Sequence, residues 1–179
     1  LSTKPDYSDA YVNIGNVLTD QEKLEEAMEA YKKALSIKPD NAEAFLNVGN
    51  ALRDQGKLEE AIEAYKKALS IKPDYADAHF NLSLIIKYKE DDDQIIQVQE
   101  LYKRENLSKD ARCSLAFSLA KMYEDVGNLD LAFRHLSEGN ALRKNLLHYS
   151  LDQDIKFFNS LKETQPHFST NANKIKDST

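Results

Sequence analysis

The chain contains few of the residues that break helices or cross-link a fold. Among its 179 residues are five glycines, four prolines, one cysteine and no tryptophan. A single cysteine, Cys113, excludes a disulfide within the chain, and we expect it to pack as a small apolar residue. No apolar run approaches 18 residues, so no membrane span is expected. Abundant Ala, Leu, Glu and Lys, all strong helix formers, favour an all-α protein.

Charge and motif content exclude several function classes. The formal net charge of −6 and the isoelectric point near 5.3 disfavour non-specific binding to nucleic acid, which requires a basic surface. The sequence has no glycine-rich phosphate loop, no cluster of cysteines and no nucleophile elbow. Four consecutive acids at 90–93 lack the spaced ligands of a calcium loop, so we expect Asp92 or Asp93 to cap a helix instead. We therefore predict a cytoplasmic protein that is not an enzyme and holds neither cofactor nor metal.

A period of 34 residues runs through the first half of the chain. Segments 8–41 and 42–75 are identical at about 24 of 34 positions, and prolines recur at Pro5, Pro39 and Pro73. Within each period an aromatic residue, a glycine and an Ala-x3-aromatic pair keep the same spacing. These positions are Tyr11, Gly15, Ala27 and Tyr31 in the first copy, and Phe45, Gly49, Ala61 and Tyr65 in the second.

This spaced pattern resembles the tetratricopeptide repeat (TPR), whose unit is two antiparallel helices. The resemblance implies an all-α, right-handed TPR solenoid of about four helix-turn-helix repeats with a C-terminal capping helix. Its expected parts are the tail of a preceding repeat at 1–7, repeats at 8–41, 42–75, 76–112 and 113–146, a capping helix at 150–163 and a linker or disordered tail at 164–179. The third repeat is degenerate and carries a three-residue insertion, which we place in the turn between its helices.

The turn inside each repeat has its own sequence signal. Gly56 and Gly127 occupy this turn in repeats two and four, and Glu22 takes the same place in repeat one. Glycine there suggests a positive φ angle, which would strain Glu22 slightly. His79 stands at the aromatic position of repeat three, so we expect a packed core histidine.

Asparagines form the most informative polar pattern. Asn13, Asn47 and Asn81 recur at the repeat interval, and Asn16 and Asn50 follow three positions after the first two. In TPR proteins the first helix of each repeat lines the inner, concave surface, so the resemblance implies that these side chains lie in a groove. Further candidates on the same face are Val12, Leu46, Arg53, Phe80 and Lys87, with Asp9 beside them.

Two interpretations of the asparagine rows remain open. An amide offers both a donor and an acceptor, so a row of amides can pair with the backbone of an extended peptide. The rows resemble the asparagine ladder of O-linked N-acetylglucosamine transferases. Alternatively, the asparagines are hydrogen-bonded within the repeats. A chaperone-type carboxylate clamp is disfavoured, because Val12, Phe80 and Leu84 stand where clamp repeats have basic residues.

The second half carries a more specific resemblance. Residues Leu115 to Lys144, LAFSLAKMYEDVGNLDLAFRHLSEGNALRK, are similar to the last repeat of bacterial proteins in which TPRs precede a sulfotransferase domain. We therefore expect a protein-interaction module that binds an extended peptide. The alternatives are the non-catalytic, substrate-recruiting arm of a bacterial TPR-sulfotransferase, or a scaffold that self-associates through its terminal repeats.

Overall fold

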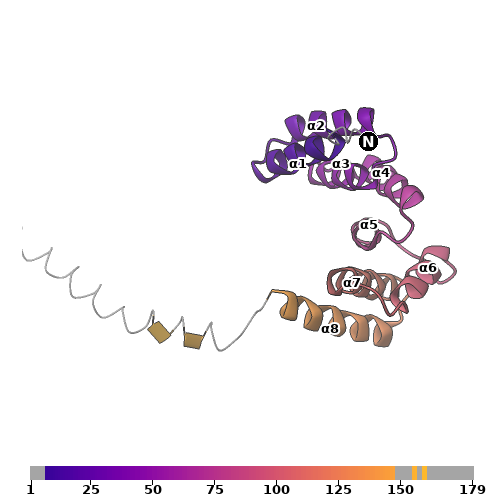
Figure 1. Ribbon diagram of the computed structural model, residues 1–179. Coiled ribbons are helices and arrows are strands. Elements are labelled where there is room, and N and C mark those ends of the chain that lie inside the picture. The colour runs from indigo at the N-terminus through magenta and orange to yellow at the C-terminus, as the bar shows by residue number, and fades with distance from the viewer. Residues whose placement is uncertain (1–6, 148–154, 157–158, 161–179) are drawn as a thin grey trace, which may run out of the picture. The chain divides into compact units, whose positions relative to one another are not determined.

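The computed structural model describes residues 7–147, 155–156 and 159–160, and within these residues the chain is helical and has no strand. The helices follow one another in chain order (Figure 1). Their bounds are α1 Tyr7–Asp20, α2 Leu24–Ile37, α3 Ala42–Asp54, α4 Leu58–Ile71, α5 Ala76–Ser83, α6 Asp93–Tyr102, α7 Lys109–Asp125 and α8 Leu129–Leu146. The prediction of an all-α protein is confirmed for the described residues.

The chain divides into two compact units, Leu1–Leu142 and Arg143–Thr179. Helices α1–α7 and most of α8 belong to the first unit. The preceding-repeat tail at 1–7 lies, except for Tyr7, outside the described residues, as do most of the expected capping helix at 150–163 and the tail at 164–179. None of the described helices combines the length and apolar character that crossing a bilayer requires.

Helix pairing in the first unit follows the repeat. Helix α1 packs on α2 and α3 packs on α4, while α2 contacts α3 and α4 contacts α5. Small and aromatic residues allow this close packing: Ala27, Ala34, Ala61 and Ala68 are fully buried, and so are Tyr31 and Tyr65. The buried apolar residues form clusters that neighbouring helix pairs share.

A buried polar contact holds the first two repeats in register. Asn41 caps α3, because its side chain accepts a hydrogen bond from the backbone N–H of Ala44 at 3.1 Å. The same amide donates to Ser8 Oγ at 3.0 Å, and Ser8 Oγ donates to the carbonyl of Ala34 at 3.1 Å. One asparagine thus both starts a helix and joins it to the preceding pair.

The third repeat departs from the pattern. Helix α5 has eight residues, whereas α1 and α3 have 14 and 13. After Ser83 the chain turns, and Tyr88 enters a cluster with Ile95 and Leu119, where it is 2% exposed. The expected acidic cap is confirmed, since Asp92 precedes α6 and accepts a hydrogen bond from Gln94 N at 3.0 Å.

His79 is a core residue, as expected, and its environment makes stability depend on pH. Its Nε2 lies 2.9 Å from the Pro73 carbonyl, which can only accept, so this nitrogen carries the proton. Burial lowers the pKa of His79 below its ordinary value. Between that lowered pKa and the ordinary 6.5, the unfolded chain binds the proton and the folded chain does not.

The free energy of unfolding should therefore fall as the pH drops below 6.5, and recover above it. We expect His79→Gln to show a weaker pH dependence than the unaltered chain in urea unfolding at a series of pH values. Burial also lowers the pKa of His135, so some dependence should remain in this variant. If the free energy of unfolding depended on pH identically in the two proteins, His79 would not be a source of the pH dependence.

The turn between α1 and α2 confirms the predicted strain. Glu22 has φ of 60°, and Gly56 and Gly127 have φ of 75° and 79°. Glu22→Gly should raise the free energy of unfolding by about 0.5–1 kcal/mol, because glycine adopts this conformation without a clash of its own Cβ. The matched control is Gly56→Glu, which should lower stability although a Cβ there meets no atom within 4 Å. A lower melting temperature for Glu22→Gly would contradict the explanation.

Candidate binding face on the first helices of the repeats

Each of the first two repeats contains the same tyrosine–glycine–asparagine arrangement. The ring of Tyr31 packs directly against Gly15, where a Cβ would stand 2.3 Å from its nearest ring carbon, and the ring of Tyr65 packs against Gly49 in the same way at 2.4 Å. This close approach brings each phenol to the asparagine that follows the glycine. Tyr31 donates to Asn16 Oδ1 at 2.9 Å and Tyr65 donates to Asn50 Oδ1 at 2.8 Å.

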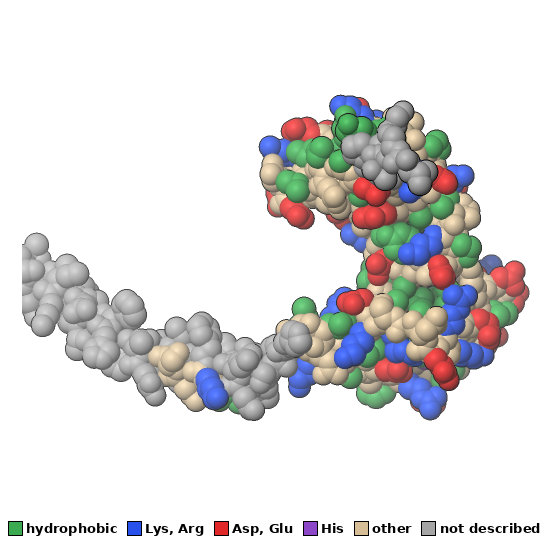
Figure 2. Space-filling view, in the orientation of Figure 1, with side chains coloured by type: hydrophobic (Ala, Val, Ile, Leu, Met, Phe, Trp, Pro, Cys, Tyr) green, Lys and Arg blue, Asp and Glu red, His purple; other side chains and the backbone are tan. Residues whose placement is uncertain are grey.

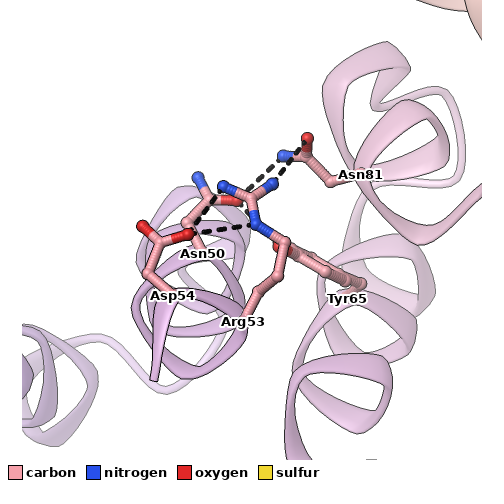
Figure 3. Close-up of polar contacts among 5 residues, drawn as sticks. All are labelled: Asn50, Arg53, Asp54, Tyr65 and Asn81. Atoms are coloured by element: carbon pink, nitrogen blue, oxygen red, sulfur yellow. Dashed lines mark hydrogen bonds and ion pairs between the residues drawn. The ribbon is translucent and has the colours of Figure 1, made fainter. Parts of the chain in front are cut away.

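The asparagines also bond to one another across neighbouring repeats. Asn47 Nδ2 donates to Asn16 Oδ1 at 2.9 Å, and Asn81 Nδ2 donates to Asn50 Oδ1 at the same distance. Figure 3 shows Tyr65 and Asn81 converging on the Asn50 oxygen. The predicted rows therefore do take part in hydrogen bonds of the fold, which is one of the two interpretations that the sequence left open.

These internal bonds decide which part of each amide remains for a ligand. The oxygens of Asn16 and Asn50 each accept two hydrogen bonds, which uses both lone pairs of an amide oxygen. Within the part of the chain that the structure describes, the nitrogens of the same two amides donate to no partner, and both side chains are half-buried. Asn16 and Asn50 can thus offer N–H donors, one from each repeat.

Arg53 adds positive charge beside this row. Its guanidinium donates to Asp54 Oδ1 from two nitrogens at 3.1 Å, and Nη1 lies 3.5 Å from Asn81 Oδ1 (Figure 3). Burial raises the pKa of Tyr65 to about 12, so this phenol remains a neutral donor to Asn50 at physiological pH. The face combines amide donors with one half-buried cation.

Other predicted site residues fall in different environments. Asn13 is exposed on α1, and Phe80 is half-buried with its ring centroid 6.0 Å from that of Phe117. Lys87 is exposed but lies beyond the end of α5, because that helix stops at Ser83. Including Val12 and Leu46 as surface contacts was wrong: they are 2% and 6% exposed, since they pack between successive helix pairs.

An apolar groove on α5, α7 and α8 was missed by the sequence reasoning. It has a volume of about 530 Å³. Its lining is Phe80, Leu84, Phe117, Ala120, Lys121, Glu124, Leu129, Ala132, Phe133 and Leu136. The signal was present in the repeat alignment: Ala120 and Leu136 stand where repeat two has Gly49 and Tyr65. Both residues line the groove.

Acidic and basic side chains both occur on the surface of the helices. On the face shown in Figure 2, acidic and basic side chains are interspersed over the helices. Exposed pairs such as Lys32–Glu29 at 2.9 Å and Lys66–Glu63 at 3.3 Å repeat in α2 and α4. Exposed pairs of this kind contribute little to stability. Within the described residues, no three His, Cys, Asp or Glu side chains are placed to hold a metal ion.

Comparison with known families identifies the repeated part of the chain. The family model described as TPR repeat matches residues 15–52 and 49–85. Residues 15–85 are therefore similar to TPR repeats, and this match covers less than half of the chain. The match covers Gly15, Gly49 and the asparagines of both rows except Asn13, so most of the candidate face lies on the matched segments. A search of curated protein sequences finds no match to the chain.

Solved structures share the fold at low sequence identity. The crystal structure of MamA is 22% identical with a TM-score of 0.56, and the match covers 82% of this chain and 84% of MamA. PilF of Pseudomonas aeruginosa is 20% identical with a TM-score of 0.63, over 77% of this chain and 62% of PilF. YrrB, described as a TPR protein with an unusual peptide-binding site, is 24% identical with a TM-score of 0.50, over 74% and 66%. These likenesses support the TPR fold.

Proposed function

We propose that the chain is a protein-interaction module that binds an extended peptide segment along the first helices of its TPRs. The observation that carries this proposal is the fixed orientation of Asn16 and Asn50. Their oxygens are held by Tyr31, Tyr65 and the next asparagine, and their nitrogens remain as donors. Donors spaced one repeat apart suit the backbone carbonyls of an extended chain, whatever side chains that chain carries.

The internal bonds also reduce the cost of binding. An asparagine free to rotate would lose side-chain entropy when a ligand fixes it. Asn16 and Asn50 are already fixed by two bonds each, so a peptide would meet preorganised donors. YrrB, which has the same fold, is described as having a peptide-binding site, and this supports a peptide as the ligand class here.

The orientation of the amides suggests a sharp test. In Asn16→Asp and Asn50→Asp the carboxylate still accepts from tyrosine and asparagine, but the outward N–H donors are gone. We expect the double variant to bind a partner peptide more weakly by about 1–3 kcal/mol, at about 0.5–1.5 kcal/mol for each lost bond. Isothermal titration with a partner segment mapped by cross-linking to the full chain would measure this difference.

Tyr65→Phe serves as the matched control for the same face. It removes a bond inside the fold but leaves the Asn50 donors in place, so affinity should fall much less than in the double variant. Thermal unfolding of all variants separates a binding defect from a folding defect. An unchanged affinity in the folded double variant would contradict the proposal that these amides bind the peptide.

We also propose, as a second candidate, that the module is the substrate-recruiting arm of a bacterial TPR-sulfotransferase. Support comes from the signature at Leu115 to Lys144, which falls on the α7–α8 pair and contains Gly139. A Cβ at Gly139 would stand 3.0 Å from the ring of Phe117, so this glycine permits the close packing of the pair. A sulfotransferase domain encoded after Thr179 would favour this candidate.

A further inference from the structure

We propose that the extended segment bound along the first helices of the repeats is positively charged, with lysine or arginine side chains that meet carboxylates on α1, α3 and α5. This inference rests on the proposed function, because it names the chemistry of the partner for the same face. It follows from how charge is distributed over the described helices. That distribution differs between the first and the second helix of each repeat.

The first helices carry mostly acidic side chains. Their carboxylates are all exposed, and they are Asp9, Asp20, Glu43, Asp54 and Asp77. Helices α1 and α5 contain neither lysine nor arginine, and α3 contains Arg53. Arg53 pairs with Asp54 at 3.1 Å (Figure 3), so its charge is balanced on its own helix.

The other carboxylates of these helices keep their charge. Among the residues that the structure describes, none of them belongs to an ion pair. Asp9 accepts a hydrogen bond from Asn41 Nδ2 at 3.4 Å, and Asp77 accepts one from Ser114 Oγ at 2.7 Å. Both donors are neutral. The negative charge of the face is therefore available to a ligand.

Each asparagine of the two rows has a carboxylate one helical turn away. Asp9, Glu43 and Asp77 stand four residues before Asn13, Asn47 and Asn81, and Asp20 and Asp54 stand four residues after Asn16 and Asn50. Side chains four residues apart lie next to each other on the same face of a helix. The amides therefore run between two rows of acidic side chains.

Two of these carboxylates act on the phenol that holds Asn16. Burial is the main cause that raises the pKa of Tyr31, and the charges of Asp20 and Glu43 raise it further. Charges influence each other in this way only over short distances, because salt screens exposed groups. The fields of two adjoining repeats therefore overlap at Tyr31, whose hydroxyl donates to Asn16.

The negative field continues into the third repeat. Burial raises the pKa of Tyr75 to about 12, and the charges of Glu43 and Asp77 contribute to this rise. Glu43 thus acts on Tyr31 in repeat one and on Tyr75 at the start of α5. The acidic side chains of successive repeats act as one continuous row.

The second helices distribute their charge differently. In α2 and in α4 three glutamates are followed by two lysines. One lysine of each helix pairs with a glutamate, as Lys32 does with Glu29 at 2.9 Å and Lys66 with Glu63 at 3.3 Å. Much of the charge on α2 and α4 is therefore balanced locally. The unbalanced acidic face is the one that carries the asparagines.

A basic segment fits both parts of this face. Its backbone carbonyls can accept from the amides of Asn16 and Asn50, and its long lysine or arginine side chains can reach carboxylates one helical turn away. Complementary charge selects the partner and speeds its association. An acidic segment, or one that ends in a carboxylate at this face, would meet like charge.

Three model peptides of equal length test this inference. They alternate serine with lysine, glutamine or glutamate, and their binding to the full chain is measured by fluorescence anisotropy at low salt. We expect the lysine peptide to bind about tenfold more tightly than the glutamine peptide, because several weak exposed ion pairs act together. The glutamate peptide should bind most weakly. At about 1 M salt, where the screening length is about 3 Å, the three affinities should converge.

The outcomes separate this inference from the proposed function. Equal affinities for the three peptides at low salt would overturn the inference and would leave binding of the peptide backbone by the amides standing. Absence of binding by all three peptides would overturn both.

A pair of double variants tests where the lysine peptide binds. Asp20→Asn with Glu43→Gln should weaken its binding by about threefold to tenfold and leave the glutamine peptide unaffected. The matched control, Glu59→Gln with Glu60→Gln, removes the same charge from exposed positions of α4 and should change neither affinity. An equal loss in the control would show attraction to the overall charge of the chain and overturn the inference.

Chemical coupling to the unaltered chain gives a measurement that needs no variant. A water-soluble carbodiimide joins lysine amines to carboxylates that they contact. Mass spectrometry should locate the coupled lysine peptide at Asp20, Glu43 and Asp77. Coupling confined to glutamates of α2 and α4 would place the peptide on the other helices and contradict the proposal.

Discussion

Replacing Gly49 by alanine is expected to lower the free energy of unfolding by about 1–3 kcal/mol. The added Cβ would stand 2.4 Å and 2.6 Å from two ring carbons of Tyr65, and no real Cβ contact is that short. The ring cannot move aside freely, because Tyr65 is fully buried and its hydroxyl donates to Asn50 at 2.8 Å. Either α3 separates from α4 or the phenol leaves its partner, and both disturb a tightly packed core. Urea unfolding monitored by circular dichroism would measure the loss.

The chain itself supplies the control for this substitution. Repeat four has Ala120 and Leu136 at the positions of Gly49 and Tyr65, so alanine is compatible with leucine opposite it. The double variant Gly49→Ala, Tyr65→Leu should therefore be more stable than the sum of its two single changes predicts. Equal and additive losses would show that the tyrosine ring is not what makes glycine necessary. Gly56→Ala tests backbone effects alone, since a Cβ there meets nothing within 4 Å.

Truncating Leu82 to alanine is expected to cost about 2–5 kcal/mol, the larger of the two effects. Leu82 lies on α5, is 1% exposed, and joins the cluster that links α3 and α4 to the third repeat. Removing three carbons leaves a cavity that neighbouring helices can close only in part. Because each repeat is stabilised mainly by its neighbours, weakening this junction should also separate the unfolding of α1–α4 from that of α5–α8. Calorimetry should then show a broader or split transition.

Leu84→Ala is the matched control for this prediction. It removes the same atoms two residues away, but Leu84 is 47% exposed, so the change should stay within about 0.5 kcal/mol. Similar losses in both variants would mean that the junction does not depend on Leu82. A single sharp transition in Leu82→Ala would show instead that the eight helices unfold as one unit despite the weakened contact.

Much of the fold could be predicted because its causes are local. Pro39 and Pro73 end α2 and α4 whatever residues follow them. The segments before them contain alanine and other strong helix formers, so they form helices by intrinsic preference. The positive φ of Glu22 follows from its alignment with Gly56, and the cap at Asp92 follows from an oxygen-bearing side chain before an apolar run. These features involve residues within one turn of one another, and a 34-residue alignment places them.

Features that depend on distant contacts were placed incorrectly or missed. Val12 and Leu46 share a helix face with the asparagines, but neighbouring helix pairs bury them. After α5 ends at Ser83, Tyr88 enters a core made by α6 and α7, and no local pattern shows this contact. The groove on α5, α7 and α8 likewise needs Leu136 and Ala120 to face each other across two helices.

The sequence by itself determined the helices, their order, the repeat unit and the rows of asparagine, because a repeating pattern of apolar side chains and helix-ending residues specifies a stack of helix pairs. Only the tertiary structure decided what those asparagines can do. The close approach of the Tyr31 ring to Gly15, and of the Tyr65 ring to Gly49, sets which amide oxygens accept internal hydrogen bonds and which amide nitrogens remain as donors for a ligand. That outcome depends on distances of a few tenths of an ångström between helices, and hydrogen bonds form or fail over such distances.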